Sequence, residues 1–169
     1  MPSFEELFRE SQGQPVKYKQ HVIQLFDRVP IASDQRVRVV FESVQSDWNQ
    51  GVALDTEGEF QVDDHPPVKK GVALWCKAPP RQFLVHIKSK KRQCLIKNVW
   101  DVGDGVMHSW HNGAAMIVEE IRNGRRYRCN DGSPDDDFDD LVFRIELLPP
   151  LALIVGKDVG NKKIKRDQS

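Results

Sequence analysis

The amino-acid sequence predicts a mainly β fold: an antiparallel β-sandwich of jelly-roll or Greek-key type with a short N-terminal helix. Short segments rich in Val, Ile and Phe carry the prediction, since many alternate apolar with polar residues. In 36–44, for example, Val37, Val39 and Phe41 occupy alternate positions. Turn signals separate these segments, and no helical period interrupts the series. Strands of this length and spacing are typical of sandwiches.

The first dozen residues predict the helix. Ser3 and Glu6 have the spacing of a capping box, in which each side chain accepts a backbone N–H at the helix start. Phe4, Leu7 and Phe8 form one apolar stripe along the same segment. We therefore expect a short amphipathic helix that packs against the strands.

The strand-like segments follow from residue 36 onward. They are 36–44, 51–62, 71–78, 81–89, 92–100, 113–121, 125–129 and 140–148. Asn123-Gly124, between two of them, is the strongest hairpin signal in the chain. The predicted organisation is a helical or irregular segment at 1–30, a β-sandwich domain at 31–155, and a basic, disordered tail at 156–169.

Composition limits the class of protein. Lys plus Arg and Asp plus Glu each total 25 in 169 residues, so the formal net charge is zero. Apolar residues make up 39% of the chain, which suffices for a core. No segment approaches the ~18 consecutive apolar residues of a membrane span, and the first residues lack a secretory signal pattern. We expect a soluble, cytoplasmic protein without a membrane span, with non-classical export left open.

Cysteines and catalytic motifs are sparse. Three cysteines are too few for a disulfide scaffold. Cys94 and Cys129 fall in separate predicted strands and could pair after export, whereas in the cytoplasm both would be small buried residues. No G-x-S-x-G or Cys-plus-His signature is present, so we predict no enzymatic activity.

Basic clusters occur at 88–92, 122–128 and 162–166. They coexist with an acidic segment and zero net charge, and no RNA-binding motif accompanies them. We therefore do not expect nucleic acid as a partner.

The most informative segment is an acidic loop at 130–140, which holds six of the 25 acidic residues. Asp135, Asp137 and Asp139 are spaced D-x-D-x-D, and such carboxylates can wrap a calcium ion. Asn130 and Asp131 could complete the coordination from the far side of the Gly-Ser-Pro turn. Alternatively, the loop is a solvated acidic turn paired with the arginines of 122–128.

Two further features of the loop refine this interpretation. An EF-hand is excluded, because Asp140 stands where that loop needs glycine and the following residues predict a strand. Phe138, an apolar ring within the aspartate run, predicts an ordered loop with one side chain packed inward. We expect Ca²⁺ as the cofactor.

The run DDDFDDLVFRIELLPP resembles the DNDYND-plus-strand signature of the bacterial calcium-mediated fucose- and mannose-binding lectins. It is also similar to the D-x-D-F-N-D motif of calcium-dependent β-sandwich adhesin domains. In the lectins, the acidic loop holds paired calcium ions, and sugar hydroxyls complete the coordination of these ions. The resemblance covers about 20 of 169 residues and implies Asp135, Asp137, Asp139 and Asp140 as ligands. The family's serine-rich sugar-binding loop has no counterpart here.

A second loop, 98–113, combines aromatic and hydrogen-bonding residues. Aromatic rings stack on the C–H faces of sugars while polar groups bind the hydroxyls. The candidate ligand-binding residues are Asp104, Trp110, His111 and Asn112. In the alternative interpretation, Trp100 and Trp110 are core anchors.

Together these patterns predict a calcium-dependent, lectin-like module for a fucose- or mannose-type or other glycan. The sugar site is expected where the acidic loop meets the 100–113 loop. Because a single monosaccharide contact is weak, a homo-oligomer would help affinity. The alternative is an intracellular protein–protein interaction or immunity-type domain, whose acidic loop is a docking surface or a purely structural calcium site.

Overall fold

The structure, a computed structural model, describes residues 3–77, 79 and 81–150. Within these residues there is one helix, α1 (Phe4–Glu10), followed by eleven strands. The strands are β1 (Val16–Tyr18), β2 (His21–Gln24), β3 (Asp27–Pro30), β4 (Asp34–Val44), β5 (Asn49–Val62), β6 (Val68–Cys76), β7 (Arg81–Ser89), β8 (Gln93–Asp101), β9 (Ala115–Ile121), β10 (Gly124–Asn130) and β11 (Leu141–Leu148). Within the described residues, no helix is long and apolar enough to span a membrane.

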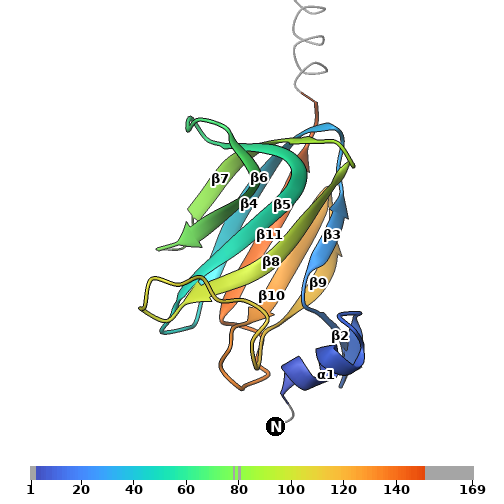
Figure 1. Cartoon of the computed structure of the whole chain (residues 1–169), viewed down its shortest axis with the longest axis vertical. Coiled ribbons are helices and arrows are strands. Elements are labelled where there is room, and N and C mark those ends of the chain that lie inside the picture. Colours follow the sequence, from blue (N-terminus) through green and yellow to red (C-terminus); the bar gives the residue numbers. More distant parts are fainter. Residues whose placement is uncertain (1–2, 78, 80, 151–169) are drawn as a thin grey trace, which may run out of the picture.

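All strands belong to one antiparallel sheet that curls into a half-barrel (Figure 1). The order is β1-β2-β9-β10-β11-β4-β7-β5-β8-β3, with β6 paired to β5. The mainly β, antiparallel class with a short N-terminal helix is therefore confirmed. The sandwich is not confirmed, because the described strands form one continuous curled sheet and not two packed sheets.

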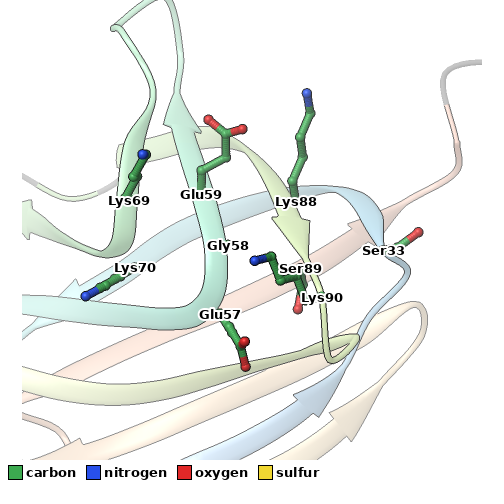
Figure 2. Close-up of a pocket in the computed structure, with 9 residues that line it drawn as sticks. All are labelled: Ser33, Glu57, Gly58, Glu59, Lys69, Lys70, Lys88, Ser89 and Lys90. Atoms are coloured by element: carbon green, nitrogen blue, oxygen red, sulfur yellow. The ribbon is translucent and has the colours of Figure 1, made fainter.

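Strand β5 causes part of the curl, because it changes neighbours along its length. Residues 49–55 pair with β8, and residues 58–62 pair with β7. Between these halves the register with β6 also shifts. Gly58 (Figure 2) lies within this break, and a Cβ there would sit 1.7 Å from the Lys88 carbonyl oxygen. A side chain at this position would push β5 away from β7.

A buried ionic contact holds one end of the sheet against its middle. Asp27, on the last strand β3, accepts hydrogen bonds from the Tyr127 hydroxyl at 2.7 Å and from Arg125 at 2.9 Å. Both donors lie on β10, which is far from β3 in the strand order. Burial and the neighbouring Asp27 raise the pKa of Tyr127, so its hydroxyl stays a donor.

The N-terminal segment closes one end of the curled sheet. Phe4 and Phe8 are buried, as the apolar stripe predicts, and they pack with Ile23 and Phe138. The predicted capping box does not form: the Ser3 hydroxyl makes no cap and instead donates to the Asn112 carbonyl at 3.2 Å. A tertiary contact has replaced the local one.

The Asn123-Gly124 hairpin is confirmed, with Gly124 opposite Ile121 and Asn123 at φ 60°. Strands β1, β2 and β3, within the predicted irregular segment 1–30, are part of the sheet. The predicted tail at 156–169 lies outside the described residues. Cys94 and Cys129 are both buried and form no disulfide with each other.

Candidate metal centre

The acidic loop connects β10 to β11, and Asn130 fixes its backbone. The Asn130 side chain donates to the Asp135 carbonyl at 2.7 Å and accepts from the Phe138 N–H at 2.8 Å. Its own carbonyl accepts from Asn98 on β8 at 2.8 Å. With both amide atoms engaged in these bonds, Asn130 acts as a scaffold for the loop.

Phe138 anchors the far side of the loop. Its side chain is 3% exposed, and its ring stacks on Phe4 with centroids 5.7 Å apart. Burial of a phenylalanine contributes about 1.5–3 kcal/mol. This offsets the ~1–3 kcal/mol cost of a left-handed backbone, which Phe138 adopts at φ 53°. The predicted inward packing of Phe138 is confirmed.

Asp131 is buried beneath the loop, and neutral donors surround it. One carboxylate oxygen accepts from the Ser133 N–H at 2.9 Å. The other accepts from the Ser46 hydroxyl at 2.7 Å and from Gln50 at 3.0 Å. Its backbone N–H donates to Asp140 at 2.9 Å. Asp131 thus links the loop to the β4–β5 connection and positions Asp140.

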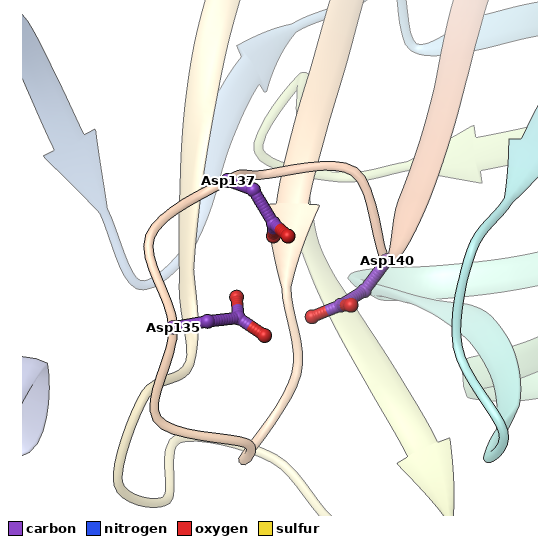
Figure 3. A group of neighbouring side chains, drawn as sticks. All are labelled: Asp135, Asp137 and Asp140. Atoms are coloured by element: carbon purple, nitrogen blue, oxygen red, sulfur yellow. The ribbon is translucent and has the colours of Figure 1, made fainter.

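Three predicted ligands come together above this scaffold. Asp135, Asp137 and Asp140 each offer a carboxylate oxygen within 4.8 Å of the others, and Figure 3 shows the three carboxylates converging. Calcium–oxygen distances are about 2.3–2.6 Å, so oxygens that share one ion lie at most about 5 Å apart. This separation fits one cation. Asp139, also predicted, lies outside the group.

Three of the four arginines of 122–128, the alternative partners for the loop, are engaged elsewhere. They bind carboxylates of β3, β4 and β9: Arg125 pairs with Asp27 and Glu120, Arg126 with Glu42 and Glu119, and Arg128 with Glu119. Lys19 does reach the loop, but it pairs with Asp136 at 2.6 Å. Among the described residues, no basic side chain makes an ion pair with Asp135, Asp137 or Asp140.

Burial and mutual repulsion therefore act on the group with no ion pair to a described basic side chain that would offset them. Burial, with the charges of neighbouring aspartates, raises the pKa of Asp140 to about 8, although the N–H of Asp131 opposes the shift. Burial and Asp137 raise the pKa of Asp135 to about 6. Burial and Asp137 also raise the pKa of Asp139. In contrast, the hydrogen bond from Lys19 lowers the pKa of Asp136.

One carboxylate atom is both buried and unpaired. The Asp135 Oδ1 has no hydrogen-bond partner among the described residues, as is also true of Gln50 Oε1. Buried polar atoms in folded proteins nearly always have a partner. A cation between the three carboxylates would supply one for Asp135.

A polar pocket of about 580 Å³ opens beside Asp135 and Asp140. Its opposite wall is the β4–β5 connection, which includes Ser46 and the half-buried ring of Trp48. Trp48 is not among the residues predicted from the sequence, because only the sheet pairing brings residues 45–48 beside the acidic loop. In the sequence, the only sign of such a role is that Trp48 is a tryptophan among polar residues.

Of the predicted 98–113 loop, residues 98–101 belong to strand β8, and the remainder forms a loop that reaches the acidic loop at Gly113. Gly113 fits against Ser133, where a Cβ would be 2.3 Å from the carbonyl oxygen, and Gly132 fits against the Trp100 ring. Trp100 is 2% exposed, so its alternative role as a core anchor is correct. Trp110 does not line the pocket beside the aspartates.

The candidate ligand-binding residues of that loop have local partners. Trp110 is 43% exposed and lies over Phe26 and Lys97, with Lys97 Nζ 4.6 Å from the ring centroid. His111 is exposed, at the edge of Trp100. The Asn112 backbone binds Glu5 and Ser3 of the N-terminal segment. Asp104 accepts from the Val106 N–H, and this bond lowers its pKa.

Comparisons with known proteins give no relative: no family model matches this chain, and no curated protein or solved structure is significantly similar to it.

Proposed function

We propose that this protein is a non-catalytic, calcium-dependent carbohydrate-binding module. The observation that carries the proposal is the grouping of Asp135, Asp137 and Asp140 within 4.8 Å, with no basic partner in the part of the chain that the structure describes. Calcium is favoured because it is a hard ion that takes 6–8 oxygen ligands. The local resemblance to the fucose- and mannose-binding lectins supports the same interpretation.

The pocket beside the carboxylates supports a sugar as the ligand. Three protein carboxylates leave positions open on a calcium ion, and vicinal hydroxyls of a sugar can fill them. Ser133 lines the pocket and offers a hydroxyl for hydrogen bonds to further sugar hydroxyls. Trp48, on the same pocket, offers an apolar ring for the C–H face of the sugar. We therefore assign the stacking role to Trp48 and not to Trp110.

A glycan array in calcium and in EGTA tests this function. Wild type should bind a subset of glycans in calcium only, and binding should be lost in Asp137→Ala and Trp48→Ala. Trp110→Ala serves as the matched aromatic control and Asp136→Asn as the matched acidic control, and both should bind as wild type does. Glycan binding that survives EGTA would contradict a calcium-bridged mechanism.

A protein partner is the second candidate function, and one observation favours it. The loop after β8 exposes four large apolar side chains beside the acidic loop: Val102, Val106, Met107 and Trp110, each 42–52% exposed. Exposed apolar groups of this kind often mark an interaction surface. If calcium binds but no glycan does, a pull-down with wild type and Met107→Ser would test this surface.

A further inference from the structure

A second pocket, of about 530 Å³, lies at the other end of the sheet from the acidic loop. Strand β4 connects the two places, because Ser33, which precedes β4, lines this pocket and Val44, which ends β4, lines the acidic one. At about 3.3 Å per residue, the eleven residues of β4 separate the two sites by roughly 35 Å. We call this second pocket the basic groove.

Four lysines line the basic groove. Lys69 and Lys70 come from β6, Lys88 comes from β7, and Lys90 follows β7 in the turn to β8. Figure 2 shows them on both sides of Gly58. All four are exposed, and none makes an ion pair with a described residue. By contrast, Lys91, which does not line the groove, pairs with Glu57 at 3.4 Å.

The bulge between β5 and β6 brings two consecutive lysines to one groove. In a regular strand, Lys69 and Lys70 would point to opposite faces of the sheet. Lys70 instead has φ 73°, a left-handed conformation that non-glycine residues rarely adopt. The register between β5 and β6 also breaks here. Both lysines line the groove as a result.

The floor of the groove is fixed by hydrogen bonds. Thr56 Oγ1 lies 2.7 Å from both Ser89 Oγ and the Gln93 carbonyl oxygen. Ser89 is 4% exposed, although it carries a polar side chain. These contacts hold the β5 bend against the β7–β8 turn, so the lysines extend from a rigid base.

Two carboxylates line the groove with the four lysines, and one of them, Glu57, is paired with Lys91. Glu59 lies between Lys69 of β6 and Lys88 of β7 in the strand register, yet it forms no ion pair within the described part of the chain. The groove therefore keeps an excess of positive charge in a protein whose net charge is zero. Such a local excess attracts anions where the protein as a whole does not.

We propose that the basic groove binds a small, multiply charged anion that carries phosphate or sulfate groups. Several ammonium groups around a rigid cleft suit an anion with several charges, because each group donates hydrogen bonds to a separate oxygen. A small ligand fits the size of the groove better than a long polymer does. This site is independent of calcium, since it contains no member of the acidic group.

Calorimetric titration in EGTA tests the proposal, with sodium tripolyphosphate in one arm and a heparin-derived sulfated disaccharide in the other. Wild type should bind at least one of them, and the affinity should fall as NaCl is raised. Lys69→Gln combined with Lys88→Gln should weaken binding roughly tenfold, as for two exposed ion pairs of ordinary strength. Glu59→Gln should strengthen it about threefold, because it removes an opposing charge.

Lys17→Gln is the matched control, because Lys17 is an exposed lysine on β1 outside the groove. This variant should bind as wild type does. Binding of one ligand only would identify its chemistry as phosphate or sulfate. Absence of binding to both ligands, or equal weakening by Lys17→Gln, would overturn the proposal.

Discussion

Two charged regions of this protein differ in how their charges are balanced. On β4, β9, β10 and β11, four arginines and three glutamates form a continuous series of ion pairs: Arg128–Glu119–Arg126–Glu42–Arg144–Glu146–Arg38. In the acidic loop, Asp135, Asp137 and Asp140 have no basic partner among the described residues, although the arginines are close in sequence. Strand pairing, and not sequence distance, has decided which carboxylates are neutralised.

This difference separates structural charges from charges that are available to a ligand. A carboxylate that already accepts hydrogen bonds from arginine gains little from a cation. The crowded carboxylates gain much, because burial and repulsion raise the pKa values of Asp135 and Asp140 and a cation relieves both effects. The comparison therefore makes opposite predictions for removal of a carboxylate in the two regions.

The largest expected effect comes from Asp27, the buried acceptor that joins β3 to β10. Asp27→Ala leaves Arg125 and the Tyr127 hydroxyl without their acceptor, and loss of one member of a buried ion pair costs about 3–5 kcal/mol. Urea unfolding should therefore show a clear drop in the free energy of unfolding. Asp137→Ala, measured in EGTA, is the comparison variant and should unfold at the same or higher urea concentration. Equal destabilisation by both variants would remove the distinction between a carboxylate paired with arginine and one without a basic partner.

The next largest effect is expected in how the stability of the folded protein depends on pH, because the carboxylates of the acidic loop have no basic partner among the described residues. The folded protein holds protons on Asp135 and Asp140 up to pKa values of about 6 and 8, whereas unfolded aspartate has a pKa near ~3.9. At pH values between the unfolded and the folded pKa, the folded state thus binds more protons than the unfolded state does. The free energy of unfolding therefore falls as the pH rises from 5 to 8. Melting curves in EGTA should show this fall by a few degrees.

Calcium should reverse the trend. Deprotonated carboxylates bind the ion, so stabilisation by calcium grows with pH. At a hundredfold excess over the dissociation constant, it amounts to about 2.7 kcal/mol. A melting temperature in EGTA that rises between pH 5 and 8 would contradict the assigned pKa shifts.

A smaller effect is expected in the series of ion pairs. Glu42 contacts both Arg126 and Arg144, and its side chain is 26% exposed. Glu42→Gln should lower the free energy of unfolding by about 1 kcal/mol, as for a partly exposed pair in a network. The loss should shrink in 1 M NaCl, because salt screens such pairs. A loss that does not depend on salt would assign Glu42 a packing role.

The sequence predicted features that depend on neighbouring residues, but it did not predict contacts between residues that are far apart in the chain. Alternation of apolar residues indicated the strands, Asn123-Gly124 indicated a hairpin, and Phe138 indicated an ordered loop. Each of these signals lies within a few residues of the structure it predicts. The bend in β5 depends on which strands pair with each half, and the apparent capping residue Ser3 binds Asn112 instead. Neither outcome could be deduced from neighbouring residues.

The candidate site shows the same limit. Spacing alone suggested Asp135 and Asp137, which the structure brings together with Asp140. It also suggested Asn130 as a ligand, whereas both side-chain atoms of Asn130 hold the loop backbone. Trp48 and Ser46 reach the site from the β4–β5 connection, about 85 residues earlier in the chain than Asp131. The partners of the arginines were likewise set by strand register.

Calcium titration by calorimetry, in a chelator-treated buffer at pH 8, tests the central claim most directly. Wild type should bind calcium, and Asp137→Asn should lose measurable binding because it removes one of the three converging carboxylates. Asp136→Asn alters the adjacent residue, whose side chain pairs with Lys19, and should retain wild-type affinity. Absence of calcium binding by wild type, or equal binding by all three proteins, would contradict the assignment of Asp135, Asp137 and Asp140 as the metal centre.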